Sequence, residues 1–281
     1  MGVADRWKDW EGTPEQSGVR FVAPTLAGAV KTLMAANVIV FLLKWLGTLG
    51  ASDVEAARYW VNSAFGLHPS AWESLLFPFW QPVTYGFVHG GLGHLFWNMV
   101  QLYFFGSMLE GILGARRFYF AYLGGLLAGA ALHCVAFAFG GVADYPTVGA
   151  SGAVIGVVVA AATLRPNRTV MFFFFPLSLK VLAIGLVIFD VYGAVEGIGG
   201  TAHWVHLGGA GFGFFGAWRG WLQRDPFAIL SARRAIRVEE QRAADVEVVD
   251  SLLEKISRDG IGSLSDKEKE ALKRASQRNK A

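Results

Sequence analysis

The chain has 281 residues, of which 53% are hydrophobic and only 17% are charged, and its mean hydropathy is +0.40. Soluble domains carry about 25% charged residues, so this composition excludes an ordinary soluble protein and predicts a membrane protein. The single cysteine, Cys134, excludes an intrachain disulfide and a cysteine-rich metal site. We attribute the pI near 9.0 to loop and tail cations that contact lipid headgroups, not to nucleic-acid binding.

Six apolar segments are candidates for membrane helices, which need about 17–25 residues. The charges between Asp5 and Glu15 argue against a cleaved signal peptide and predict a cytoplasmic N-terminal segment over 1–26. We therefore expect an all-α membrane bundle of six helices over 27–222. The fourth helix is expected to be short. Its length of about 24 Å is less than the ~30 Å thickness of the hydrocarbon core. The segments are 27–48, 85–109, 117–139, 149–164, 178–195 and 201–221.

Loop charges predict the orientation of these helices. Arginine pairs follow the second, fourth and sixth segments, whereas the opposite connections at 140–148 and 196–200 contain no Lys or Arg. Cytoplasmic loops are enriched in positive charge, so both termini are expected in the cytoplasm. The pairs are Arg116 with Arg117, Arg165 with Arg168, and Arg219 with Arg224.

Two connections are rich in aromatic residues. The first connection, about 49–84, carries three tryptophans among few charges, and we expect it in the outer headgroup layer. The stretch Met171 to Pro176 holds four successive phenylalanines. We expect it to be an interfacial approach to the fifth helix, because Lys180 would otherwise lie deep in lipid.

Residues 223–281 are polar enough to form a cytoplasmic tail. Apolar residues recur at helical spacing from Val248 to Ile256 and stop near Gly260. Ser265-x-x-Glu268 is the signature of a capping box that opens a second helix. We predict a helical hairpin. Its pattern fits a docking module for a cytoplasmic partner and a solubilising tail equally well.

A serine and a histidine lie in apolar segments, where polar groups are costly and usually mark function. Ser151, in Gly149-Ala150-Ser151-Gly152, opens the fourth segment, and His206 lies inside the sixth. The serine motif alone is weak, because small residues also serve helix packing. The predicted orientation, however, puts both side chains at a similar shallow depth on the non-cytoplasmic side. They then form a candidate nucleophile and general base for acyl transfer.

Glycine faces on the two segments would let the helices meet. Gly209 and Gly213 share the face of His206, and Gly152 and Gly156 lie four residues apart on the fourth segment. His203 competes as the base, but it lies closer to the helix start and lacks that glycine face. For either histidine the alternative is an interfacial side chain that faces water.

The second segment supplies candidate donors for an oxyanion. His94 and Asn98 lie four residues apart on one helix face, and such side chains can stabilise the negative oxygen of a tetrahedral intermediate by ~3 kcal/mol each. The alternative is an interhelical hydrogen-bonded pair, worth ~0.6–2 kcal/mol in a membrane bundle.

Together these motifs resemble the rhomboid intramembrane serine proteases, of the bacterial six-helix type with a C-terminal cytoplasmic extension. The resemblance covers about residues 75–220. It implies Ser151 as nucleophile, His206 as base, and His94, Asn98 and the Ser151 backbone N–H as the oxyanion hole. The motifs are Trp80-Gln81-Pro82-Val83-Thr84-Tyr85, His89 through His94 to Asn98, Gly106 with Glu110, Gly114-x-Arg116-Arg117-Phe118, Gly149-Ala150-Ser151-Gly152 and His206-Leu207-Gly208-Gly209.

The resemblance also implies secondary roles and two departures. Glu110 and Arg116 would be structural residues that hold the turn after the second helix. Gln81 stands where an arginine is common in the family, and Ile155 stands where an aromatic residue often stacks on the catalytic histidine. The family uses a serine–histidine dyad, so we do not expect Asp190 to complete a triad, although it is the one acid buried deep in the fifth helix.

The expected function is therefore cleavage of single-span membrane proteins near the outer face of the bilayer, with no cofactor and no metal. A bacterial plasma membrane is the expected location. The alternative is a catalytically inactive rhomboid-like chaperone, although such proteins lose the serine or the histidine. A transporter would show internal repeats, and the sequence has none that we detect.

Overall fold

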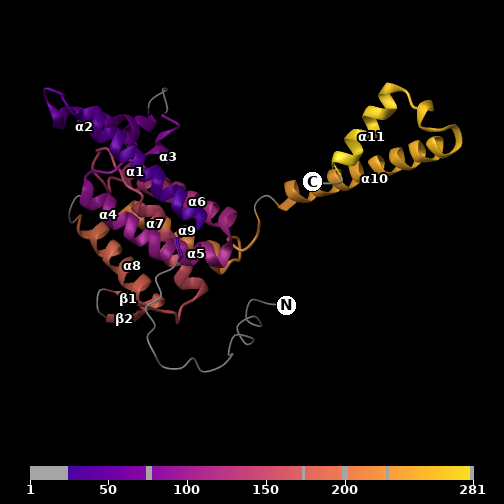
Figure 1. Ribbon diagram of the computed structural model, residues 1–281. Coiled ribbons are helices and arrows are strands. Elements are labelled where there is room, and N and C mark those ends of the chain that lie inside the picture. The colour runs from indigo at the N-terminus through magenta and orange to yellow at the C-terminus, as the bar shows by residue number, and fades with distance from the viewer. Residues whose placement is uncertain (1–24, 74–77, 173–174, 198–201, 226–227, 279–281) are drawn as a thin grey trace. The chain divides into compact units, whose positions relative to one another are not determined.

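The computed structural model describes residues 25–73, 78–172, 175–197, 202–225 and 228–278 (Figure 1). The expected cytoplasmic segment 1–26 lies almost wholly outside the described residues, as does most of the connection 196–200. The chain divides into two compact units, of which the first ends at Arg219 and the second begins at Gly220.

The long helices of the first unit coincide with five of the six expected segments. They are α1 (Gly28–Thr48), α6 (Ala115–Ala138), α7 (Ser151–Leu164), α8 (Leu179–Glu196) and α9 (His203–Trp218). Within the described ranges, α1 and α6 are the two helices that meet both the length and the hydropathy required to cross a membrane; α7 is apolar but has only 14 residues.

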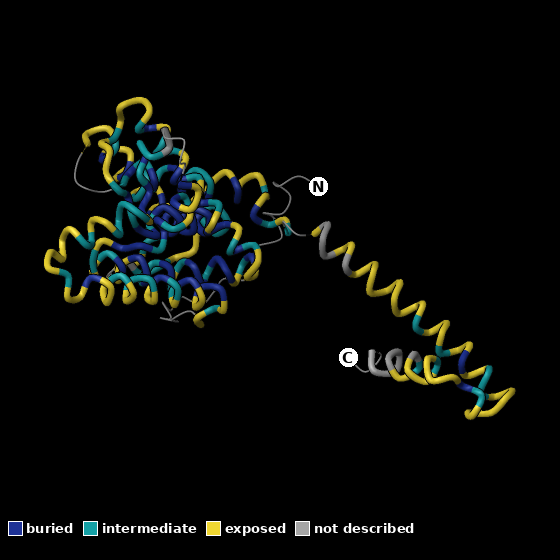
Figure 2. Tube along the Cα trace, turned by 90° about the horizontal axis from the view of Figure 1, so that it is seen from above, coloured by how far each residue is buried: buried dark blue, intermediate teal, exposed yellow. Residues whose placement is uncertain are grey.

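Helix α7 forms the centre of this unit. Every residue from Gly152 to Ala162 is buried, and Figure 2 shows the buried residues of this unit in its interior with exposed residues around them. The outward faces of α1 and α8 are instead apolar and exposed; Leu43 and Ile188, for example, each keep 63% of their surface accessible. A buried small-residue helix inside an apolar outer layer is the arrangement expected where lipid is the solvent.

The second expected segment, 85–109, is helical only from Leu92 onward, so its predicted start was wrong. A short helix α3 (Gln81–Thr84) precedes an irregular stretch, and α4 (Leu92–Gln101) then continues through a π-helical turn (Leu102–Gly106) into α5 (Ser107–Leu113). The Tyr85 carbonyl accepts a hydrogen bond from the Gly149 N–H at 2.9 Å, and its hydroxyl donates to the Leu126 carbonyl at 2.7 Å. Tyr85 therefore serves two neighbouring segments instead of continuing a helix.

The expectation of an all-α fold fails at one place. Strands β1 (Thr169–Phe172) and β2 (Phe175–Ser178) pair antiparallel, with Thr169 opposite Ser178 and Val170 opposite Leu177. β-Branched and aromatic side chains favour this pairing, and Pro176 cannot continue a helix. The stretch does precede the fifth helix, as expected, but as a hairpin; Phe173 and Phe174 lie outside the described residues. Lys180 is exposed and donates to Asn167 at 3.2 Å.

The first connection folds into helix α2 (Val54–Phe65) and a 3₁₀ turn (Pro69–Glu73). The Gln81 side chain binds this connection at two points. Its Oε1 accepts from the His68 N–H at 3.0 Å, and its Nε2 donates to the Ser63 carbonyl at 3.1 Å. The side chain is 3% exposed. Gln81 can therefore hold this loop without the arginine common in the family. The location of the first connection in the outer headgroup layer stays a prediction.

The side chain of Glu110 binds the first turn of α1. Its two carboxylate oxygens accept from the N–H groups of Ala29 and Val30, at 3.0 and 2.9 Å, and so satisfy donors at the start of α1. Arg116 lies in the first turn of α6, just after Gly114, whose φ of +80° turns the chain between α5 and α6. The Glu110 carbonyl also accepts from the Gly114 N–H at 2.7 Å, so Glu110 contacts this turn as well as α1.

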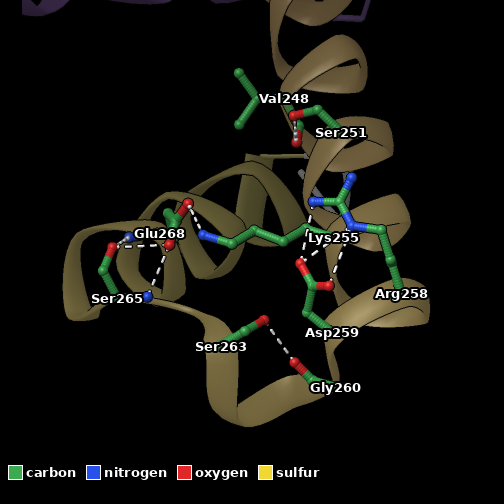
Figure 3. Close-up of polar contacts among 9 residues, drawn as sticks. All are labelled: Val248, Ser251, Lys255, Arg258, Asp259, Gly260, Ser263, Ser265 and Glu268. Atoms are coloured by element: carbon green, nitrogen blue, oxygen red, sulfur yellow. Dashed lines mark hydrogen bonds and ion pairs between the residues drawn. The ribbon is translucent and has the colours of Figure 1, made fainter.

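The second unit is the predicted helical hairpin. Helix α10 (Ala228–Asp259) is followed by a 3₁₀ turn (Ile261–Ser263) and α11 (Asp266–Arg278). The capping box is confirmed, because the Ser265 N–H donates to Glu268 at 2.7 Å and the Glu268 N–H donates to the Ser265 hydroxyl at 3.3 Å (Figure 3). Lys255 Nζ donates to Glu268 at 2.8 Å and joins the two helices.

This network predicts an acid-sensitive start of α11. The hydrogen bonds from Lys255 and Ser265 lower the pKa of Glu268 to about 2, from an ordinary value of 4.5. A lowered carboxyl pKa means that the stabilisation is present above pH 4.5 and is lost as the pH falls towards 2. A carbon-13 NMR titration of the Glu268 carboxyl in the full-length protein should have its midpoint near 2.

The Ser265→Ala variant should raise that midpoint, because it removes one of the hydrogen bonds to the carboxylate. Ser251→Ala is the matched control, since the Ser251 hydroxyl donates to the Val248 carbonyl instead. A midpoint near 4.5 in the unaltered protein would contradict the network.

Candidate active site

Helices α7 and α9 approach each other so closely that their contact positions have no room for a side chain. A methyl group added at Gly209 would collide with the Gly152 carbonyl oxygen, and one added at Gly213 would collide with that of Gly156. Gly208 lies against α6, where a methyl group would collide with the Ala128 carbonyl oxygen. The expected glycine faces therefore lie together, and small residues are what allow helices to approach this closely.

This approach puts Ser151 beside His206. The Ser151 Oγ lies 2.8 Å from Nε2 of His206, and the imidazole is 12% exposed. Gly152 follows the serine directly, and Gly209 lies one helical turn after the histidine. The backbone contact between the helices consequently sets the distance between these two side chains.

Asp190, which we did not expect to complete a triad, lies against His206. This residue of α8 is 2% exposed, and its Oδ1 lies 2.8 Å from Nδ1 of His206. A carboxylate only accepts hydrogen bonds, so Nδ1 of His206 carries the proton and Nε2 is left to accept the hydroxyl proton of Ser151. The available signal was an acidic residue inside an otherwise apolar segment.

His203, the competing base, also contacts Asp190. Its Nδ1 lies 2.8 Å from the same carboxylate oxygen, and its ring meets the His206 ring edge-on at 6.2 Å. The histidine that contacts Ser151 is therefore His206. Ile155, which stands where the family often has an aromatic residue, is buried. The His206 imidazole meets the ring of His203 instead.

Within the described ranges, one group of side chains could also hold a metal ion, namely Asp190, His203 and His206. Their ligand atoms lie within 4.8 Å of one another. Two imidazole N–H groups directed at one carboxylate oxygen account for the same arrangement by hydrogen bonding alone, and they satisfy a buried charge.

The turn before Ser151 requires glycine. Gly149 has a φ of +126°, a backbone conformation that other residues rarely adopt. A Cβ at this position would lie 2.6 Å from Nε2 of His94 and 3.7 Å from Oγ of Ser151. Gly149 therefore lets His94 come up against the segment that carries the serine.

The expected oxyanion donors face the same cavity as the serine. This cavity has a volume of about 440 Å³, and its lining includes Ser151, His206, His94 and Asn98. The Asn98 amide donates to the backbone carbonyl of His94 at 2.9 Å, a bond within α4 rather than between helices. Ser151 opens α7, where backbone N–H groups have no partner inside the helix. His94, Asn98 and Ser151, the three residues expected to supply oxyanion donors, thus border the same cavity.

Comparison with known proteins gives two family matches. A model described as a rhomboid domain matches residues 77–223, and a model described as a family of unknown function matches residues 236–278.

Three relatives show the range of similarity. Human presenilin-associated rhomboid-like protein, mitochondrial, is 30% identical over 207 residues, 70% of this chain and 50% of the relative. RHOMBOID-like protein 12, mitochondrial, of Arabidopsis thaliana is 30% identical over 46% of this chain and 42% of its own length. Rhomboid protein 1, mitochondrial, of Saccharomyces cerevisiae is 30% identical over 47% and 39%. The chain thus spans half or less of the length of these relatives.

The helix contact yields a direct prediction for Gly209→Ala. The added methyl group must push α9 away from the Gly152 carbonyl, and overpacking of this kind costs about 1–3 kcal/mol. The midpoint of thermal unfolding in detergent should fall. Gly211→Ala on the same helix is the control, because a methyl group there meets nothing within 4 Å. Equal midpoints for the two variants would contradict the close contact.

Proposed function

The chain belongs to the rhomboid family, and on that premise we propose that it is an intramembrane serine endopeptidase with Ser151 as nucleophile and His206 as general base. The observation that carries the proposal is the 2.8 Å contact between Oγ of Ser151 and Nε2 of His206. A serine hydroxyl is a weak nucleophile at neutral pH and needs an adjacent base of this kind.

The reaction follows from that geometry. Oγ of Ser151 attacks the scissile carbonyl while Nε2 of His206 takes the hydroxyl proton. The tetrahedral intermediate then collapses, the peptide C–N bond breaks, and His206 gives its proton to the leaving amine. A water molecule, activated by the same imidazole, hydrolyses the acyl-enzyme and restores the serine.

The oxyanion hole in this proposal consists of His94, Asn98 and the backbone N–H of Ser151. All three residues border the cavity of about 440 Å³. The N-terminus of α7 adds a partial positive charge at the serine, where negative charge develops on the former carbonyl oxygen.

The proposed setting is a six-helix membrane domain with both termini in the cytoplasm. The cavity that Ser151 lines also has the polar residues Gln101 and Thr147 in its lining, which supports access of water to the serine. The proposed substrates are single-span membrane proteins. A helix hides its carbonyls in internal hydrogen bonds, so we expect substrates with helix-weakening Gly or Pro near the cut.

The membrane itself is specified more coarsely than the sequence suggested. The resemblance to bacterial rhomboids led us to expect a bacterial plasma membrane, whereas the three relatives compared above all carry mitochondrial names. The proposal therefore specifies an integral membrane protein. The hairpin α10–α11 is proposed to lie in the cytoplasm, where a partner could reach it.

The Ser151→Ala variant should lose cleavage of a model single-span substrate and keep its thermal unfolding midpoint. Ser178→Ala is the matched control, because Ser178 directly precedes α8 and its side chain makes no capping hydrogen bond to that helix. Undiminished turnover by Ser151→Ala would end the nucleophile assignment. Wild-type protein that binds the substrate without cleaving it would favour the alternative, an inactive rhomboid-like chaperone.

Removal of one oxyanion donor should slow the reaction without weakening binding. Loss of a single donor typically costs about 10²–10³-fold in kcat. We therefore expect His94→Ala and Asn98→Ala each to lower kcat by about that factor, with KM changed less than about threefold. A rise in KM at constant kcat would show that these residues bind the substrate instead.

A further inference from the structure

Asp190 is a buried carboxylate whose single oxygen serves two imidazoles. Its Oδ1 lies 2.8 Å from Nδ1 of His206 and 2.8 Å from Nδ1 of His203. Burial of a carboxylate costs several kcal/mol unless hydrogen bonds compensate for the lost water. Two N–H donors provide that compensation here. Neither donor lies on the helix that carries Asp190.

The surroundings of His203 show that this arrangement is built into two helices. Gly193, one turn after Asp190 on α8, leaves the space that the His203 ring fills, since a Cβ there would collide with that ring. The Phe189 ring meets the same imidazole edge-on at 5.6 Å. His203 is 5% exposed. Its imidazole is thus confined against α8 with Nδ1 directed at Asp190.

The residues that flank Asp190 on α8 are apolar and exposed. Phe189 and Val191 are 62% and 46% exposed. Asp190 faces the other way, towards α9. The two imidazoles are therefore its polar partners across the α8–α9 contact.

We propose that Asp190 is a positioning residue for His206 and that His203 in turn holds Asp190, so that the site is a chain of four side chains, Ser151, His206, Asp190 and His203. This inference rests on the proposed protease function and adds two residues to it. Asp190 fixes the proton of His206 on Nδ1, which leaves Nε2 to accept the proton of Ser151. It also stabilises the imidazolium that forms when that proton moves.

The first test replaces Asp190 by Asn, which keeps the shape and one acceptor but removes the charge. We expect kcat on a fluorogenic transmembrane peptide to fall by about 10²–10⁴-fold, while KM changes less than about threefold. Glu196→Gln is the matched control, because it removes an exposed carboxylate from the same helix. A kcat within about twofold of wild type would overturn the proposal.

A spectroscopic readout separates positioning from mere stability. Nitrogen-15 NMR of histidine-labelled protein should show the His206 ring protonated on Nδ1 in wild type and in Glu196→Gln. The Asp190→Asn spectrum should show loss of that preference. An unchanged tautomer in a folded Asp190→Asn protein would contradict the assignment.

The second test addresses His203. His203→Phe retains a ring to fill the space beside Gly193 but has no N–H. We expect kcat to fall by about 10–100-fold, the range of one hydrogen bond to a charged group. The double variant with Asp190→Asn should be no slower than Asp190→Asn alone, since both changes act through one carboxylate. Multiplicative losses would show that His203 acts independently, and unchanged kcat in His203→Phe would remove it from the chain.

These outcomes remain distinct from failure of the proposed function. If wild-type protein shows no turnover that depends on Ser151, the protease proposal fails and this inference fails with it. If turnover depends on Ser151 but not on Asp190, the protease proposal stands and only the four-residue chain is wrong. If Asp190→Asn does not fold, the kcat of His203→Phe decides alone.

Discussion

The site depends on the contact between α7 and α9 at backbone distance. Lipid gives helices no hydrophobic reason to associate, so close packing of small residues supplies the attraction. Gly209 lies against Gly152, and Gly213 against Gly156, without space for a methyl group between them. Because Gly152 follows Ser151 directly and Gly209 lies one turn after His206, the same contact that holds the helices together also places the hydroxyl beside the imidazole.

Three buried polar side chains of the first unit are held by other polar groups of the protein. Asp190 accepts from two imidazoles, Glu110 caps the start of α1, and Gln81 ties two points of the first connection. Each is nearly buried, so removal of a partner would leave an unsatisfied donor or charge. Of the three, Asp190 acts directly on the arrangement near Ser151, because it contacts His206.

Much of this could be predicted from periodicity and spacing. Apolar length and loop charge located five helices within a few residues, and Ser265-x-x-Glu268 located the start of α11. The pairing of Ser151 with His206 followed from their depth and from glycines on matching faces. These features depend on local pattern, which one sequence displays.

The failures occurred where distant contacts decide. The helix expected from residue 85 begins at Leu92, because Tyr85 bonds to Gly149 and Leu126 from other parts of the chain. Strand Thr169–Phe172 pairs with strand Phe175–Ser178 in a stretch that we expected to be an interfacial approach to the fifth helix. Asp190 was judged by the family dyad, and only the packing of α8 against α9 brings it to His206. The spacing of residues along α8 did not by itself predict that its Asp190 face meets α9.

In the proposed site, His206 activates Ser151 across this helix contact. Treatment of the folded protein with a fluorophosphonate probe, followed by peptide mass spectrometry, identifies the modified residue. We expect one adduct, on Ser151, and its loss in His206→Ala. An adduct on another serine, or equal labelling of Ser151 without His206, would contradict this activation.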